Sequence, residues 1–284
     1  AAGGRAVQQA PTWDYAQVLM RSGGLGLVDS IAYPYPWAQP PEPAGASSEA
    51  AAEAFWEPLG AQLRGSSPPA LVYLVHPHFP TGHKDPQFAR RLEALVAGAG
   101  GRTLFAVDQT YLGFTPRTED DARLEELALN SDGVALIRSL SKVEGLAAMR
   151  LGYALAGPRT ARELAGCLPF SGGLYVSEVA LAGALAAIGG RGADGHRRAV
   201  AEYYREEQAW LREQLEALGI ALAPSPCPFF CLRLPRDAIR EAFKKGAALQ
   251  DVTHPAARGG AGLTLAPGEA WACCLVQDRA GNAS

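Results

Sequence analysis

A small set of side chains in this sequence could bind and use an aldehyde cofactor that carries a phosphate. Lys142 supplies an amine that can form an imine once desolvation or nearby positive charge lowers its pKa. Arg150, Ser139 and Ser141 supply a guanidinium fork and hydroxyl donors suited to a phosphate. Asp108 follows an apolar run and is expected at the carboxyl end of a parallel strand, where open α/β sheets bind ligands. Together these are the groups that pyridoxal phosphate requires.

A carboxylate and a nearby tyrosine form the electronic part of this hypothesis. Asp108 would keep a pyridine nitrogen protonated, and the charged ring would then accept electrons from a developing carbanion. Tyr111, three residues later, could reach the phenolic oxygen of the ring. Simpler interpretations stay open: a turn-capping aspartate, a packed loop aromatic, a solvated lysine at position 142, an ion pair at Arg150 and turn chemistry for the serines.

These residues would be positioned by alternating short apolar strands and amphipathic helices. The pattern predicts an α/β fold with a doubly wound, mostly parallel sheet in a large domain over residues 1–157. From about Pro158 the pattern changes to a smaller α+β domain over residues 158–284. The predicted elements are strands at 70–75, 103–107, 134–138, 229–234 and 271–276 and helices at 49–63, 85–97, 119–129, 159–167, 176–188, 195–218 and 236–245.

Composition and charge narrow the possible function. The net charge is −3 and the pI is near 6.0, so we expect the protein to bind neither nucleic acid nor an anionic membrane surface. No apolar run approaches the roughly 20 residues of a membrane span. The first residues do not form a signal peptide, and the missing initiator Met indicates a trimmed or partial chain.

The cysteines predict a reducing environment. Their odd number, five, and the absence of a Cys-x-x-Cys spacing indicate mostly buried, reduced thiols in a cytoplasmic protein. Cys227 and Cys231 could form half of a zinc site, but the sequence shows no second ligand pair. We therefore expect no metal.

Three segments of the chain resemble the fold-type-I aminotransferases. The segments are His76-Pro77-His78-Phe79-Pro80-Thr81-Gly82, Asp108-Gln109-Thr110-Tyr111, and Ser139-Leu140-Ser141-Lys142 followed by Arg150. The resemblance covers roughly residues 10–235 and is closest to class I/II enzymes of the histidinol-phosphate aminotransferase type. It implies a pyridoxal-phosphate-dependent transferase fold and a homodimer with active sites at the interface.

Site roles also follow from the resemblance. Lys142 resembles the Schiff-base lysine, Asp108 the partner of the pyridinium nitrogen, and Tyr111 the tyrosine at the phenolic oxygen. Ser139, Ser141 and Arg150 resemble the phosphate cup. Trp13 lies in a segment, Pro11-Thr12-Trp13, that resembles the one whose aromatic side chain stacks on the pyridine ring; a core tryptophan is the alternative.

The chain departs from the family pattern in three places. His76 and Phe79 stand where the cofactor loop has its two asparagines, and a phenyl ring cannot donate the hydrogen bond that the second asparagine gives. Either the imine is altered, or His76, His78 or Tyr111 compensates, or no cofactor is held in the usual pose. Only ten residues precede Pro11, so either the chain is incomplete at this end or the segment that supplies backbone amides to the phosphate is absent. The stretch 269–275 lacks the arginine that binds the substrate carboxylate, although Arg258 and Arg279 are near in sequence.

The sequence thus predicts a pyridoxal-phosphate-dependent aminotransferase that acts on a small amine or amino acid through Lys142. Two alternatives remain. The first is another reaction of the same cofactor: a lyase, decarboxylase, cyclase or oxidase. The second is a scaffold or binding protein that keeps the fold without turnover.

Overall fold

The computed structural model describes residues 3–13, 15–33, 46–168, 176–220, 222–223, 225–235, 237–238, 249–251 and 269–275. Its larger part is a six-stranded sheet with the order β2-β1-β3-β4-β5-β6. The strands are β1 (Arg5–Ala10), β2 (Leu27–Ala32), β3 (Leu71–Val75), β4 (Leu104–Asp108), β5 (Val134–Ser139) and β6 (Gly152–Leu155). The predicted strands at 70–75, 103–107 and 134–138 are confirmed as β3, β4 and β5.

Five of the six strands are parallel, and β6 is the exception. It pairs antiparallel with β5, with Ser139 opposite Gly152. The segment between them holds a tight turn at Gly145, where φ is +69°, and the 3-10 turn η2 (Ala147–Met149). Because this segment has no long helix to carry the chain back across the sheet, the next strand runs in the opposite direction. The cofactor-binding segment predicted from the sequence lies in this return.

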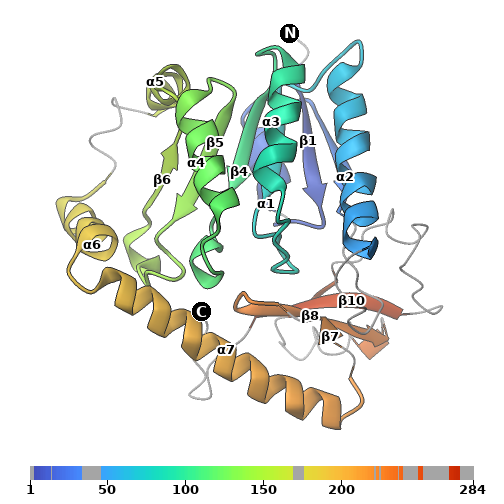
Figure 1. Cartoon of the computed structure of the whole chain (residues 1–284), viewed down its shortest axis with the longest axis vertical. Coiled ribbons are helices and arrows are strands. Elements are labelled where there is room, and N and C mark those ends of the chain that lie inside the picture. The colour runs from blue at the N-terminus through green and yellow to red at the C-terminus, as the bar shows by residue number, and fades with distance from the viewer. Residues whose placement is uncertain are drawn as a thin grey trace.

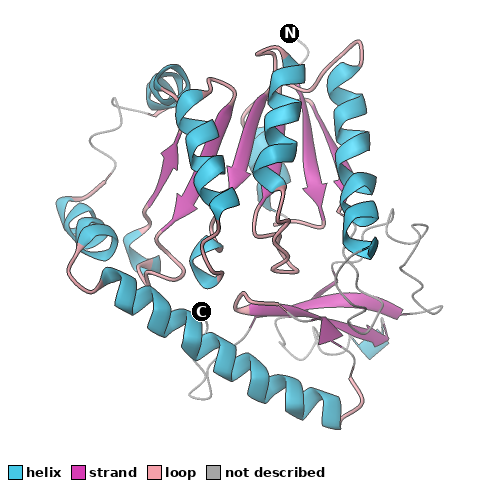
Figure 2. Ribbon diagram, in the orientation of Figure 1, coloured by secondary structure: helices cyan, strands magenta, loops and turns pink. Residues whose placement is uncertain are grey.

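Helices cover both faces of the sheet (Figures 1 and 2). The helix α1 (Tyr15–Ser22) packs on one face, where Ala16 and Met20 meet Tyr73 and Val75. The opposite face carries the largest apolar core. The helices that contribute to it are α2 (Ala46–Arg64), α3 (Phe88–Ala99) and α4 (Glu119–Asn130). Since successive strand residues point to opposite faces, alternation along β3 sends Val72 and Leu74 to this second layer.

The apolar stripe predicted for residues 85–97 is confirmed in α3, although the helix begins later than expected. Phe88 and Leu92 are fully buried, and Leu95 and Val96 pack against the same core. The first helical residue is Phe88 because the carboxylate of Asp85 is engaged in the preceding turn. It accepts hydrogen bonds from the Gln87 backbone N–H and from Trp56 Nε1, both at 2.9 Å.

The second half of the described chain contains three helices and an antiparallel sheet. The helices are α5 (Pro158–Cys167), α6 (Glu178–Gly189) and α7 (Ala193–Ala217). The sheet has the order β7-β8-β10-β9, with β7 (Leu222–Ala223), β8 (Phe229–Pro235), β9 (Leu249–Asp251) and β10 (Glu269–Leu275). These elements confirm the predicted helices near 159–218 and the strands near 229–234 and 271–276. The predicted helix at 236–245 lies largely outside the described residues.

The two sheets meet at the carboxyl ends of the parallel strands (Figure 1). Helix α7 runs beneath this edge, and its Tyr204, Leu211 and Leu215 cover Phe230 and Leu232 of β8. The other side of β8 faces the loops that follow β3, β4 and β5. A second apolar group there joins Phe229, Cys231, Phe114 and Val143 with the partly buried Phe79 and Tyr111.

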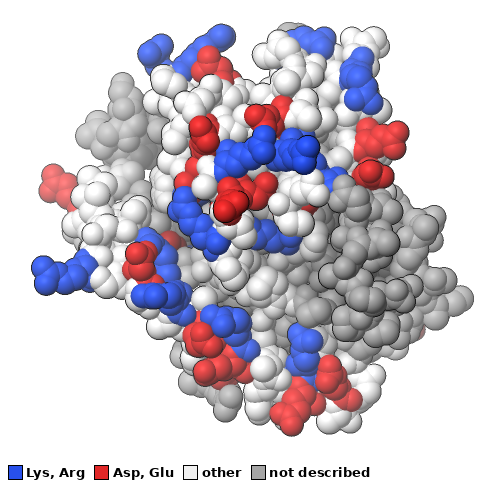
Figure 3. Space-filling view, viewed as in Figure 1, with Lys and Arg blue, Asp and Glu red and all other residues white. Residues whose placement is uncertain are grey.

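Charges of both signs are mixed on the face shown in Figure 3, over α3 and α4 and along α7. Ion pairs of these helices include Arg123 with Glu93 and Arg205 with Glu202. Within the described residues, no helix is both long and apolar enough to cross a membrane.

Candidate active site

Asp108 is the last residue of β4, and both of its carboxylate oxygens accept hydrogen bonds. Oδ1 accepts the Thr110 backbone N–H at 2.8 Å, and Oδ2 accepts the Tyr73 hydroxyl at 2.7 Å. Burial, followed by the negative charge of Asp108, raises the pKa of Tyr73 far above its ordinary value. Tyr73 therefore keeps its proton and acts as the donor. The predicted position of Asp108 at a strand end is confirmed.

Tyr111 and Lys142 lie together although they come from different loops. The Lys142 Nζ is 5.4 Å from the centroid of the Tyr111 ring, within the range of a cation–π contact. Burial and, secondarily, the positive charge of Arg150 lower the pKa of Lys142. Both effects favour the free amine that the sequence hypothesis requires.

A close contact between two turns sets the Tyr111–Lys142 distance. Tyr111 precedes the 3-10 turn η1 (Leu112–Phe114), and Val143 follows Lys142. A Cβ placed on Gly113 would lie 2.3 Å from Cγ1 of Val143, so only glycine allows the turns to approach this closely. The contact fixes the two candidate side chains relative to each other.

The predicted phosphate-binding residues belong to the same β5–β6 return as Lys142. Ser139 ends β5, and its Oγ accepts the Ser141 backbone N–H at 3.1 Å. Arg150 adopts a left-handed backbone conformation with φ of 49°, which returns the chain from η2 to β6. Its side chain is exposed and donates to the Ala147 carbonyl at 3.0 Å. The Arg150 charge is nevertheless near enough to contribute, after burial, to the lowered pKa of Lys142.

His76 lies on the face of the sheet opposite Asp108. Val75 pairs with Asp108 in register, so the following side chain points to the other face, toward α3. There the His76 ring stacks on Phe88 at a centroid distance of 4.0 Å, and burial lowers its pKa to about 3. The structure therefore does not bring His76 to the other candidate residues, contrary to its predicted place in cofactor binding.

Both ring nitrogens of His78 make hydrogen bonds that stabilise its own loop. Its Nε2 lies 2.9 Å from the Pro11 carbonyl, which can only accept, so this nitrogen is the donor. Its Nδ1 then accepts from the Thr81 hydroxyl at 2.9 Å. Burial lowers the pKa of His78 to about 3, consistent with this neutral form. With both nitrogens engaged, His78 cannot replace the missing loop asparagine, but it ties residues 78–81 to the segment containing Trp13.

Trp13 is half exposed, with 49% of its surface accessible, and precedes α1. Its ring centroid is 5.6 Å from that of Tyr15, and no described element covers it. The helix that follows, α1, packs on the same face of the sheet as Tyr73 and Val75. Trp13 therefore lies just before α1, on the face of the sheet toward which the Asp108 side chain points.

Phe79 joins an aromatic group that sequence reasoning did not anticipate. Its ring lies nearly parallel to Tyr111, with a centroid distance of 6.1 Å and an interplanar angle of 14°. Phe229 of β8 meets both rings edge to face, at 5.0 Å from Phe79 and 4.7 Å from Tyr111. The position of the lost asparagine is thus filled by an apolar contact between the two sheets. No local signal in the sequence links Phe229 to this group.

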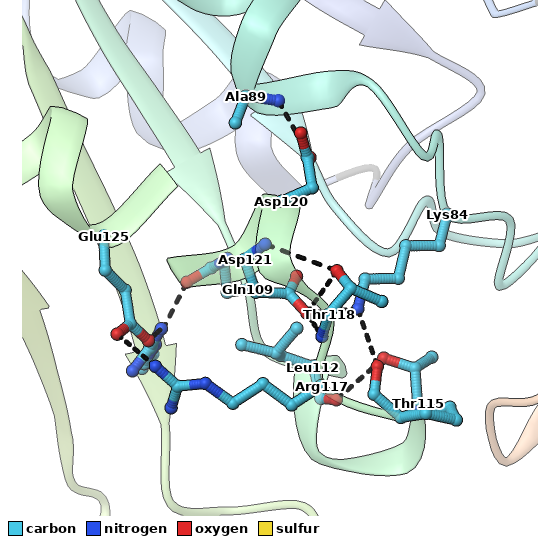
Figure 4. A network of polar contacts seen from close by, with 12 residues as sticks. Lys84, Ala89, Gln109, Leu112, Thr115, Arg117, Thr118, Asp120, Asp121 and Glu125 are labelled. Atoms are coloured by element: carbon cyan, nitrogen blue, oxygen red, sulfur yellow. Dashed lines mark hydrogen bonds and ion pairs between the residues drawn. The ribbon is translucent and has the colours of Figure 1, made fainter. Parts of the chain in front are cut away.

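A polar network behind the site was also not predicted (Figure 4). Arg138 Nε donates to Gln109 Oε1 at 3.0 Å, and its Nη2 donates to Glu125 at 2.5 Å. Gln109 directly follows Asp108, and Arg138 directly precedes Ser139. One turn earlier on α4, Lys84 pairs with the buried Asp121 at 2.5 Å. These contacts connect α4 to the loop after β3 and to the end of β5, and through Arg138 to Gln109 after β4.

The remaining sequence predictions concern metal and substrate binding. Cys227 and Cys231 are buried free thiols, and Cys231 Sγ lies 3.3 Å from the Pro80 carbonyl. Among the described residues, no group of three or more His, Cys, Asp or Glu side chains could hold a metal ion. Arg258 and Arg279 lie outside the described residues.

Sequence comparison identifies the family that carries these features. Residues 3–268 match the family model for aminotransferase class I and II. The chain belongs to this family. The assignment agrees with the resemblance inferred from the three site segments.

Individual aminotransferases of this family are similar to the chain over part of their length. Histidinol-phosphate aminotransferase from Maricaulis maris is 33% identical over 179 residues, which cover 63% of this chain and 47% of that protein. Histidinol-phosphate aminotransferase 1 from Psychrobacter arcticus is 30% identical over 173 residues, which cover 61% and 42%. The matched region therefore spans less than half the length of these curated relatives.

A solved aminotransferase structure has the same fold. It is histidinol-phosphate aminotransferase from Sinorhizobium meliloti in complex with pyridoxal-5'-phosphate, with a TM-score of 0.68 and 20% sequence identity. The superposition covers 98% of this chain and 67% of that one. The predicted fold class, a fold-type-I transferase fold with a mostly parallel sheet and a second α+β part, is confirmed.

Proposed function

We propose that this protein is a pyridoxal-phosphate-dependent aminotransferase acting on a small amine or amino acid. The observation that carries the proposal is the placement of Lys142 against Tyr111, with an amine whose pKa is lowered by burial and by Arg150. The family match and the named aminotransferase relatives support the same activity.

The described residues fit this cofactor by the chemistry of their side chains. Asp108 is a carboxylate with lone pairs to spare after two hydrogen bonds, and it could pair with a protonated ring nitrogen. Lys142 could hold the aldehyde carbon as a Schiff base, and Tyr111 could donate to the phenolic oxygen. Ser139, Ser141 and Arg150 could bind the phosphate, and Trp13 could cover the ring. When bound, the cofactor supplies an electron-accepting ring that weakens bonds at the substrate carbon bearing the amine.

Lys142 would also move the proton that transamination requires. Its free ε-amine would accept a proton from the substrate carbon as general base, and the resulting ammonium would return that proton as general acid. A lowered pKa keeps a larger fraction of this amine unprotonated near neutral pH. The Phe79, Tyr111 and Phe229 rings would limit water at this side of the site.

The phenyl ring of Phe79 leaves Tyr111 as the proposed donor to the phenolic oxygen. His76 faces α3, and both nitrogens of His78 are engaged. In the proposed site the Tyr111 hydroxyl is therefore the donor to the phenolic oxygen, whereas the family pattern adds the amide of a loop asparagine.

Three further proposals concern the whole protein. The chain would divide into a cofactor domain at 1–157 and a smaller domain at 158–284, with Pro158 opening α5. It would form a homodimer, a view supported by exposed apolar side chains such as Val179 and Leu185 on α6. It would work in the cytoplasm, in keeping with the free thiols of Cys227 and Cys231.

Absorbance spectroscopy tests the cofactor and the role of Lys142 together. Purified protein mixed with pyridoxal phosphate and desalted should keep a near-visible band that borohydride bleaches, and mass spectrometry should locate the reduced adduct on Lys142. Lys142→Ala should show neither, while Lys142→Arg tests whether charge alone retains the cofactor. Absence of the band in the wild type, or labelling at another lysine only, would contradict the proposal. Amino-group transfer is then measured with a panel of amines and oxo acids.

A further inference from the structure

Tyr73 is a buried tyrosine whose hydroxyl points at the carboxylate of Asp108, the residue proposed to pair with the cofactor. Only 8% of its surface is accessible, and it packs among the apolar residues Ala6, Val75 and Ala106. A buried tyrosine hydroxyl needs a polar partner, and here the partner is Asp108 Oδ2 at 2.7 Å.

The strand register explains why these two side chains meet. Tyr73 pairs with Ala106, and Val75 pairs with Asp108, in adjacent parallel strands. Side chains two residues apart on a strand share a face, so all four point toward the α1 layer. The long tyrosine side chain reaches diagonally along this face to the carboxylate at the strand end. Tyr73 is thus fixed by the sheet itself rather than by a loop.

We propose that Tyr73 is a positioning residue whose hydrogen bond holds the Asp108 carboxylate oriented toward the ring nitrogen of the bound cofactor, and so favours a proton on that nitrogen. This inference rests on the proposed function. Tyr73 acts through Asp108 and needs no contact with the cofactor or the substrate.

The electrostatic reason is the preference of a hydrogen-bond donor for the charged form of its acceptor. A hydroxyl that donates to a carboxylate stabilises the anion and lowers its affinity for a proton. The effect is larger in an apolar, water-poor layer than in solvent. When the Asp108 carboxylate that accepts the Tyr73 hydrogen bond lies next to the protonated ring nitrogen, the proton stays on the nitrogen. Without the Tyr73 hydroxyl, the proton shifts toward Asp108 and the ring becomes a weaker electron acceptor.

The direct test is the ¹⁵N NMR resonance of ring-labelled pyridoxal phosphate bound to the protein. In the wild type this resonance is expected at the protonated-pyridine position. Tyr73→Phe should move it toward neutral pyridine and weaken cofactor binding about tenfold, the effect of losing one hydrogen bond to a charged group. Tyr33→Phe is the matched control, because the buried Tyr33 hydroxyl also makes a 2.7 Å bond, to the His83 ring. It should leave the resonance unchanged.

Replacement of Tyr73 by 3-fluorotyrosine provides a second variant that keeps shape and hydroxyl but donates more strongly. It should not move the resonance toward neutral pyridine, and any displacement should be in the opposite direction to that of Tyr73→Phe. Circular dichroism checks that each variant is folded. If Tyr73→Phe does not fold, the fluorotyrosine variant provides the test.

Two patterns of results separate the inference from the proposed function. If the wild type binds the cofactor but Tyr73→Phe gives the same resonance, or Tyr33→Phe gives the same displacement, Tyr73 has no specific role. A fluorotyrosine variant displaced toward neutral pyridine would also overturn the inference. If the wild type does not retain pyridoxal phosphate, the proposed function itself fails and the inference fails with it.

Discussion

Arg138 donates a hydrogen bond to Gln109 at 3.0 Å, and this contact joins the ends of two neighbouring strands. Gln109 follows the proposed ring-nitrogen partner Asp108, and Arg138 precedes the segment that carries Lys142. Glu125 of α4 holds Arg138 from the other side. The two halves of the proposed site are therefore linked by a side-chain contact as well as by the sheet.

This link can be measured by a double-mutant cycle with Gln109→Leu and Arg138→Met. The expected coupling is about 0.5–1.5 kcal/mol in the free energy of unfolding, typical of an intramolecular hydrogen bond between side chains in contact. Urea unfolding of the wild type, both single variants and the double variant gives the value. Strictly additive losses would show that the contact contributes no stability.

Because Gly113 packs against Val143, we predict that a methyl group added at position 113 would push Tyr111 and Lys142 apart. Gly113→Ala would place a Cβ 2.3 Å from Val143 Cγ1, so the turns must move apart. We expect a loss of about 1–3 kcal/mol in unfolding free energy, as for other overpacked sites, together with weaker pyridoxal phosphate binding.

Two variants control for this substitution. Gly98→Ala adds a methyl group in α3 where no atom lies within 4 Å, and it should raise stability by up to about 1 kcal/mol through helix propensity. Val143→Ala in the Gly113→Ala background should restore part of the cofactor affinity. A Gly113→Ala protein with wild-type stability and affinity would contradict the packing argument.

Arg150 lowers the pKa of Lys142 by charge repulsion, so its removal should raise that pKa. Competitive acetylation of the cofactor-free protein, followed by mass spectrometry, reports the pH at which Lys142 becomes reactive. In Arg150→Met the midpoint should move to higher pH. Arg159→Met removes an exposed arginine paired with Glu163 and should leave the midpoint unchanged. A midpoint that does not respond to Arg150 would assign the lowered pKa to burial alone.

The buried histidines predict a loss of stability in mild acid. Burial lowers the pKa of His76 and of His78 to about 3 in the folded protein, below the ordinary value of 6.5. As the pH falls below about 6.5, the unfolded chain binds protons that the folded chain does not. The free energy of unfolding should then fall by up to about 1.4 kcal/mol per pH unit for each histidine, until the folded pKa is reached.

His76→Phe isolates one of these contributions. The phenyl ring can occupy the stack on Phe88 but cannot be protonated. Urea unfolding between pH 7.5 and pH 5 should show a shallower pH dependence for this variant, by about one proton's contribution. Equal slopes for the variant and the wild type would mean that His76 is not held neutral in the folded state.

The sequence by itself determined which chemistry the chain could carry and where on the fold it would lie. Lys142, Asp108 and Tyr111 follow apolar strands, and strand ends are recognisable from local patterns of side chains. The family match and the fold of a solved aminotransferase agree with the predicted family and fold class. Local periodicity was also sufficient for β3, β4, β5, α3 and α4, because each buries a stripe defined by its own residues.

Only the tertiary structure decided which side chains face each other. The register of β3 against β4 sends Tyr73 to Asp108 and turns His76 away from it, although the two residues are only three apart in the chain. Phe229 reaches Phe79 across more than a hundred residues, through the packing of one sheet on the loops of the other. Such contacts depend on how separate elements align, and a one-residue change in register would reverse every face.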